Sequence, residues 1–158
     1  MKKIILLWSM VIIWMGVIFY LSNMDTGESN GKSREVITKV VDTTVDISHA
    51  KGEVSPKSKE KMVDKLNKPL TKCAHASGYF ILAILILNAL LSCNNKHLLV
   101  ILLTIFLCFI YACTDEYHQT FVSGRTGQFS DVLIDTMGSV VACLVYYGIK
   151  KRRIVVNK

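Results

Sequence analysis

Ionisable side chains gather in one stretch of the sequence, residues 111–135, which lies between two long apolar runs. Carboxylates, an imidazole and a guanidinium occur there together, at Asp115, Glu116, His118, Arg125, Asp131 and Asp135. A charge in or near a lipid bilayer is expensive unless another group pairs with it. The stretch therefore predicts either a binding site or a cluster of ion pairs at a membrane boundary.

Helical spacing places several of these groups on a shared face, because residues three or four apart are neighbours on an α-helix. Tyr111, Asp115, His118 and Gln119 form one stripe if the apolar run before them continues as a helix through this point. Glu116 then points about a quarter-turn away. This spacing predicts that one helix end carries most of the acid–base groups.

Two other segments supply polar groups at the same spacing. Asp131 and Asp135 lie one turn apart at the start of the last apolar run, where the helix dipole favours a negative charge. Lys72, His75 and Tyr79 are three and four residues apart, so they share a face at the start of the second apolar run. We therefore expect three spans to bring polar side chains to one end of a bundle.

Three interpretations of this cluster stay open. In the first, ion pairs and hydrogen bonds only pin the helices together. In the second, Lys72 and Arg125 hold an anionic headgroup, and the acid–base chemistry, if there is turnover, comes from the histidines and neighbouring carboxylates: His75, His118, Asp115 and Glu116. Tyr79, Gln119, Asp131 and Asp135 would then be further binding residues. We favour the second interpretation and leave open whether the protein is an enzyme.

The third interpretation is a metal site. Carboxylates with one imidazole suit Mn²⁺ or Zn²⁺, and the ligands considered are Asp115, Glu116, His118 and Asp131. The sequence contains no recognised metal-ligand spacing and no cofactor motif. We therefore expect no metal and no cofactor.

Four apolar segments must position these residues, and they predict an all-α integral membrane four-helix bundle in a single domain, residues 1–158. The expected spans are residues 4–22, 73–91, 98–114 and 129–149. The first contains no charge over 19 residues, which as a helix would measure about 28 Å, close to the thickness of a bilayer core. It is also too long for the apolar core of a cleaved signal peptide and no A-x-A pattern follows it, so we expect a retained anchor.

The first loop, residues 23–72, is long and amphipathic. Val36, Ile37, Val40 and Val41 recur at helical spacing, although their β-branched side chains also allow a strand. A second helix is expected to begin with Ser55 as its N-cap and Pro56 in its first turn, to present Met62, Val63 and Leu66 on one face, and to end at Pro69. We expect both helices to lie on the membrane surface.

The net charge of +7 does not indicate a nucleic-acid partner, because basic residues flank the spans. Lys2 and Lys3 precede the first span, Lys96 lies in the second loop, and the run 150–153 follows the fourth span. This is the positive-inside pattern. It predicts a multi-pass protein of the cell membrane with both termini in the cytoplasm, the 23–72 loop and the polar cluster on the outer side, and anionic lipid bound to the basic C-terminal tail.

The motif residues together resemble the signature of the VanZ-like proteins, which are small bacterial integral membrane proteins. "DEYHQTFVSGRTGQFSDVLIDTMGS" is similar to the family pattern D-E-x-H-Q, P-G-R and D-x-x-x-D/N-T-x-G, and "KCAHASGY" is similar to K-x-x-H-x-x-x-Y. The resemblance covers most of the chain. Two positions depart from it: Ser123 replaces a common proline, and Gly78 replaces an acidic residue, which would remove one carboxylate from the site.

The resemblance implies a link to the cell envelope. The founding member of the family accompanies glycopeptide-resistance genes and is associated with decreased susceptibility to teicoplanin, a glycopeptide with a lipid tail. Carried over to this chain, it implies that the protein binds or modifies the headgroup of a membrane lipid or a lipid-linked wall precursor. The alternative is a non-enzymatic membrane scaffold whose polar cluster is structural.

Overall fold

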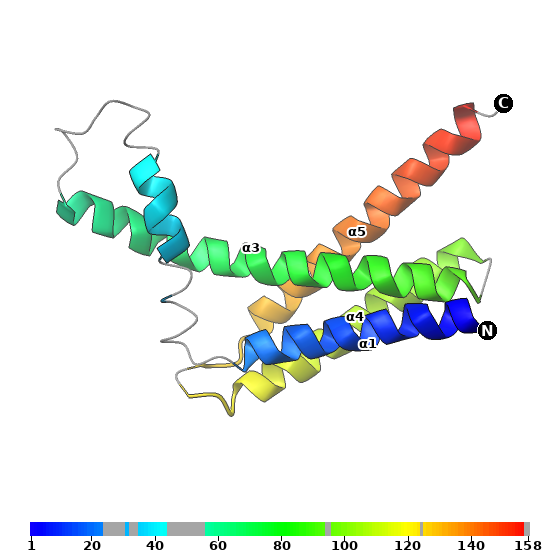
Figure 1. The fold of residues 1–158 in the computed structure, drawn as a ribbon, viewed down its shortest axis with the longest axis horizontal. Coiled ribbons are helices and arrows are strands. Elements are labelled where there is room, and N and C mark those ends of the chain that lie inside the picture. Colours follow the sequence, from blue (N-terminus) through cyan, green and yellow to red (C-terminus); the bar gives the residue numbers. More distant parts are fainter. Residues whose placement is uncertain (24–30, 32–34, 44–55, 94–95, 124, 157–158) are drawn as a thin grey trace.

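The computed structural model consists of four long helices, and they confirm the predicted all-α membrane bundle. They are α1 (Lys2–Ser22), α3 (Pro56–Leu91), α4 (His97–Gln119) and α5 (Phe129–Val156) (Figure 1). Each contains a segment long and apolar enough to cross a membrane. The structure describes residues 1–23, 31, 35–43, 56–93, 96–123 and 125–156, and a short helix also covers residues 35–43.

Lipid is the solvent that these helices require. Large apolar side chains on all four long helices face outward, among them Ile5, Ile81, Leu98, Phe106 and Leu144. No water-soluble bundle would leave so much apolar surface uncovered. Backbone hydrogen bonds within each helix satisfy the polar main chain, as a bilayer demands.

α3 is the central element of the bundle, and it packs against α1, α4 and α5. The main core lies where these helices meet, around fully buried Tyr79, Leu82 and Ala83 of α3 and Cys108 and Ala112 of α4. Small residues such as Ala83, Cys108 and Ala112 are interspersed with the larger side chains of this core. They allow the helix backbones to approach closely, which replaces the hydrophobic driving force that is missing between helices in lipid.

The first loop differs from the prediction at Pro69. α3 begins at Pro56, as expected, but it runs through Pro69 without interruption into the second span. A proline inside a helix removes one backbone hydrogen bond, at a cost of about 3 kcal/mol. Here Pro69 is exposed, so the carbonyl of residue 65, which the proline leaves without a donor, is open to solvent.

The helix over residues 35–43 confirms the helical alternative for this segment over the strand. Ile37 and Val41 pack on Val63 of α3 in a small separate core. Val36, Val40, Met62 and Leu66 remain exposed, which leaves an apolar surface outside the bundle. The expected N-cap, Ser55, lies outside the described residues.

The ends of the helices fall into two groups. The C-terminal ends of α1 and α4 (Ser22 and Gln119) and the N-terminal end of α5 (Phe129) lie at one end of the bundle; the N-terminus of the chain and the C-terminal ends of α3 and α5 lie towards the other (Figure 1). Because the N-terminus and the C-terminal end of α5 lie towards the same end of the bundle, this arrangement agrees with an even number of membrane crossings. The helix ends thereby bring the polar residues of four segments to one face.

Candidate functional site

The polar site is built first by the extension of α4 beyond its apolar run. α4 continues to Gln119, so the predicted stripe forms, with Asp115 and Gln119 buried. The Ser22 hydroxyl, at the end of α1, donates to Asp115 Oδ2 at 2.8 Å, and Gln119 Nε2 lies 3.4 Å from the same oxygen. One carboxylate thus joins the ends of α1 and α4.

Glu116 lies on a different side of α4, as the helical spacing predicts. It is 5% exposed, and its Oε2 accepts a hydrogen bond from the backbone N–H of Gln128 at 2.9 Å. Gly127 permits this contact, since a Cβ there would stand 2.7 Å from the Glu116 carbonyl oxygen. Glu116 therefore fixes the loop between α4 and α5 against the last turns of α4.

Next to Glu116 an open pocket of about 250 Å³ lies between the end of α4 and the start of α5. Its lining combines polar and aromatic groups: Cys113, Glu116, Tyr117, Thr120, Gly127, Gln128, Phe129 and Val132. The pocket opens at the membrane-boundary end of the bundle. Its size and lining suit a small polar group attached to an apolar body.

An ion pair joins α3 to α5 at the same end. Lys72 Nζ lies 2.6 Å from Asp131 Oδ1, with both side chains part-exposed. Arg125 is in the turn before α5, where its backbone N–H donates to the Val122 carbonyl at 3.1 Å, and it interacts electrostatically with Asp115 and Glu116. The structure therefore pairs Lys72 with a carboxylate, as predicted, and places the charge of Arg125 where it acts on two others.

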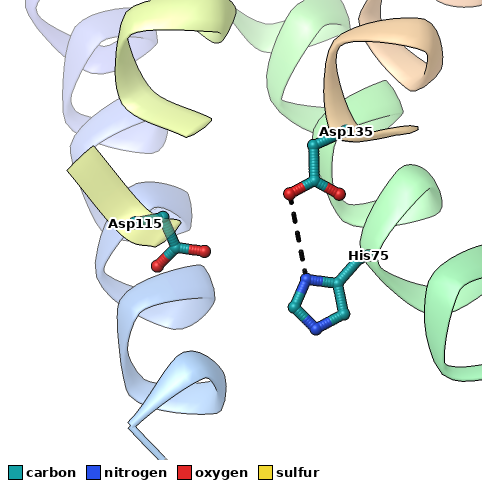
Figure 2. Close-up of side chains that lie close together, drawn as sticks. All are labelled: His75, Asp115 and Asp135. Atoms are coloured by element: carbon teal, nitrogen blue, oxygen red, sulfur yellow. Dashed lines mark ion pairs between the residues drawn. The ribbon is translucent and has the colours of Figure 1, made fainter. Parts of the chain in front are cut away.

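The centre of the site consists of His75, Asp115 and Asp135, which come from α3, α4 and α5 (Figure 2). One ligand atom from each lies within 4.8 Å of the others. His75 Nδ1 faces Asp135 Oδ2 at 3.9 Å, which is too long for a hydrogen bond. Asp135 is fully buried, and neither of its oxygens has a hydrogen-bond partner; Asp115 Oδ1 has none either.

Tyr79 lies one turn beyond His75 on α3. It is fully buried, its hydroxyl has no hydrogen-bond partner, and it interacts electrostatically with Asp115 and Asp135. Its ring stands 6.0 Å from that of Tyr111, whose hydroxyl donates to the Met15 carbonyl of α1 at 2.6 Å. The two tyrosines thus form the apolar floor of the site.

His118 is the sequence-predicted residue that the structure turns away from this centre. Its ring packs on that of Phe19 of α1, with the centroids 4.3 Å apart and the planes tilted by 31°, and its Nε2 lies 3.3 Å from Asn23 Oδ1. The metal set considered from the sequence is not the set that the structure brings together. In the described part of the chain, the group that could share an ion contains Asp115 with His75 and Asp135.

Sequence reasoning missed Ser22 and Gly138. Ser22 reads as the first residue of a turn cluster, and only the packing of α1 on α4 brings it to Asp115. Gly138 lets α3 and α5 cross closely beside the site, since a Cβ there would overlap the Ala76 backbone. Its place in the D-x-x-x-D-T-x-G pattern was a signal that could have found it.

Gly78, which departs from the family pattern, points away from the central carboxylates. A Cβ built there would lie against Ile18 of α1 at 3.9 Å, an ordinary contact. Its carbonyl accepts a hydrogen bond from Trp14 Nε1 at 2.9 Å. The glycine therefore serves the packing of α1 on α3, and the group of His75, Asp115 and Asp135 does not depend on an acidic residue at 78.

The arrangement can hold a charged ligand at the end of a membrane bundle. A half-buried imidazole beside two buried carboxylates can bind a cation or move a proton, and the cations Lys72 and Arg125 stand nearer the surface, where they can attract an anion. The pocket beside Glu116 and the group around Asp115 lie at the same end of α4, because Glu116 follows Asp115 directly.

Comparison with known proteins places the chain in a family. The family model VanZ/LLP1 matches residues 7–151, nearly the whole chain and all of the polar residues described above. No curated protein and no solved structure matched the chain. The chain belongs to the VanZ/LLP1 family and is a multi-pass, VanZ-like membrane protein.

Proposed function

We propose that this protein binds the headgroup of an envelope lipid or a lipid-linked wall precursor, and that it thereby alters susceptibility to teicoplanin. The observation that carries the proposal is the position of two cavities. The pocket beside Glu116, which has this carboxylate in its otherwise largely apolar lining, lies at the membrane-boundary end, and an apolar groove of about 320 Å³ lies between α1, α3 and α4. The headgroup of a lipid suits the pocket beside Glu116, and its acyl chain suits the apolar groove.

The apolar groove supports a lipid over a soluble ligand. Its lining comes from the membrane-spanning segments and is almost wholly apolar: Trp8, Val11, Met15, Leu82, Ile86, Leu107, Ile110, Tyr111 and Thr114. Within a bilayer the solvent at this depth is hydrocarbon, so an acyl chain is the occupant. Tyr111 and Thr114 place one end of the groove within about one turn of Asp115.

The headgroup would meet the polar residues at that end. Lys72 and Arg125 would attract an anionic group such as a phosphate. Glu116 would accept hydrogen bonds from a sugar or amine, and Tyr117 offers an aromatic surface to the same pocket. If the ligand is modified, His75 together with the carboxylates of Asp115 and Asp135 would supply the acid–base chemistry.

The test compares the envelope lipids and precursors of cells with and without the protein by mass spectrometry, together with teicoplanin tolerance in a sensitised host. Glu116→Gln keeps the size of the side chain and an oxygen for the Gln128 N–H, but it removes the charge in the pocket. Its matched control is Glu35→Gln, on an exposed side chain paired with Lys39 outside the bundle. We expect the first variant to lose the phenotype and the second to keep it.

Two results would contradict this proposal. One is an unchanged lipid and precursor profile when the protein is absent. The other is full teicoplanin tolerance in Glu116→Gln, His118→Ala and Arg125→Ala variants that are present at normal levels in the membrane.

A structural scaffold is the second candidate function, and particular contacts favour it. Hydrogen bonds and an ion pair at this end join separate helices, namely Ser22 to Asp115 and Lys72 to Asp131. If the cluster only pins the bundle, Asp131→Asn lowers the melting temperature in detergent and changes no lipid. Loss of the phenotype with unchanged stability favours the binding site instead.

The orientation of the protein is part of the proposal. The basic residues around the spans support cytoplasmic termini and an outward-facing site, and α5 extends through the basic run 150–153, which would lie against anionic lipid. The side chains of residues 151–158 lie outside the described residues. A Thr126→Cys variant with Cys93 as its internal reference tests the orientation, because these positions lie at opposite ends of the bundle.

A membrane-impermeant thiol reagent added to whole cells should label position 126 and leave Cys93 unlabelled. The reverse labelling pattern would overturn the orientation.

A further inference from the structure

We propose that His75, Asp115 and Asp135 bind one divalent cation in the bundle, with Mn²⁺ or Zn²⁺ as the ions that suit the ligands. The three side chains come from different helices and face a common space (Figure 2). Binding a cation here does not depend on any headgroup. It also replaces the expectation from sequence that the protein holds no metal.

The first argument is geometric. Three atoms that lie within 4.8 Å of one another leave a common point at most about 2.8 Å from each. Ligand distances to zinc are about 2.0–2.2 Å, so side-chain rotations that move each atom by less than about 1 Å complete the coordination. His75 Nδ1 already points to Asp135, at 3.9 Å.

The second argument is the set of unused acceptors. Asp135 is 0% exposed and both of its oxygens lack a hydrogen-bond partner, as does Oδ1 of Asp115. A buried charge is normally paired, hydrogen-bonded or bound to a metal. In contrast, the other oxygen of Asp115 accepts hydrogen bonds from Ser22 and Gln119, so this carboxylate is held in place with one oxygen left without a partner.

The third argument is the local charge. The described residues at this end include four carboxylates, Asp115, Glu116, Asp131 and Asp135, and two permanent cations, Lys72 and Arg125. With the carboxylates ionised and His75 neutral, as a metal ligand requires, the sum is two negative charges. One divalent cation restores neutrality in a low-dielectric environment, where an uncompensated charge is costly.

The ligand types then select the class of ion. One imidazole nitrogen and two carboxylate oxygens suit Mn²⁺ or Zn²⁺, whereas the absence of thiolate from the group disfavours soft ions. Three protein ligands leave at least one coordination position open. Tyr79, with its buried and unpartnered hydroxyl, lies beside the group.

The test uses the full chain purified in detergent, freed of metal with EDTA and titrated with Mn²⁺ or Zn²⁺. Free Mn²⁺ has a six-line electron paramagnetic resonance signal, so its loss reports binding, and calorimetry reports Zn²⁺. We expect one ion per chain and a higher melting temperature with the ion. His75→Ala and Asp135→Asn should each weaken binding at least about 100-fold, because even residues that only support metal ligands are worth about 10–100-fold.

Glu35→Gln is the control, since it removes an exposed carboxylate that pairs with Lys39 outside the bundle. It should bind the ion with the affinity of the wild type, because an exposed ion pair contributes little. If Asp135→Asn does not fold, His75→Ala and Asp115→Asn carry the comparison.

Three results would overturn the proposal: a cooperatively melting wild type with no saturable binding of either ion, binding that is unchanged in the variants at 75 and 135, or an equal loss in the Glu35→Gln control. In the first case protons, not a metal, neutralise the buried carboxylates. Because the titration contains no lipid substrate, its failure leaves the proposed headgroup binding standing, and the failure of headgroup binding leaves the metal site standing.

Discussion

The crossing of α3 and α5 at Gly138 yields the sharpest stability prediction. A Cβ built at this position would overlap the Ala76 carbonyl oxygen and lie 2.9 Å from its carbonyl carbon and 3.1 Å from its Cα. These are backbone atoms of a packed helix, so no rotamer change relieves the overlap. Gly138→Ala must move the two helices apart by on the order of 1 Å, and such overpacking costs about 1–3 kcal/mol.

The substitution has an opposing effect that a control can remove. Alanine favours a helix over glycine by up to about 1 kcal/mol. Gly148→Ala, on the same helix, makes this gain without the overlap, because nothing lies within 4 Å of a Cβ at 148. The difference between the two variants therefore isolates the helix crossing, and for a chain of this size about 1–3 kcal/mol corresponds to roughly 2–12 °C in melting temperature.

The assay follows the reaction of a fluorogenic maleimide with the buried free thiols Cys108 and Cys143 as detergent-solubilised protein unfolds. Gly138→Ala should melt below the wild type, and Gly148→Ala should melt at or above it. If both alanine variants melt within about 1 °C of each other, the close approach of α3 and α5 is wrong. The displacement should also separate His75 from Asp135, so Gly138→Ala should bind Mn²⁺ more weakly if the cation site exists.

Two further substitutions test contacts at the polar end. Ser22→Ala leaves the buried Asp115 without its 2.8 Å donor, so we expect the free energy of unfolding to fall by about 1–3 kcal/mol. The control Ser9→Ala removes an exposed hydroxyl that is hydrogen-bonded within its own helix, and it should change the free energy of unfolding by no more than about 0.5 kcal/mol. Equal effects of the two substitutions would contradict the contact between α1 and α4. Gly127→Ala brings a Cβ to 2.7 Å from the Glu116 carbonyl, so the loop should detach and become sensitive to limited proteolysis, and unchanged proteolysis would refute this.

The sequence by itself determined the helices and the end of the bundle where the polar groups gather. Uncharged apolar runs such as 4–22 can satisfy their backbone in lipid only as helices, and short connections force neighbouring spans to run antiparallel. The spacing of Asp115 and Gln119 then set the buried face of α4, because that spacing follows from the helix period alone. The family signature could likewise be recognised from the sequence, because each of its two segments, residues 72–79 and 115–139, is continuous in the chain.

Only the tertiary structure decided which polar residues meet. Helical spacing places His118 and Asp115 on the same face of α4, so by sequence either could belong to the centre of the site. In the structure His118 packs on Phe19 of α1, whereas Asp115 accepts a hydrogen bond from the Ser22 hydroxyl. The continuation of α3 through Pro69 likewise depended on the exposed position of the proline, which local sequence rules do not take into account.

The central group of the site shows the physical reason most clearly. His75 and Asp135 are 60 positions apart in the chain, and their 3.9 Å approach depends on how closely α3 and α5 cross. That crossing depends on the missing side chain of Gly138. The helix period is a local property that can be predicted from the sequence, whereas the crossing angle and the distance between two helices follow from packing between residues far apart in the chain.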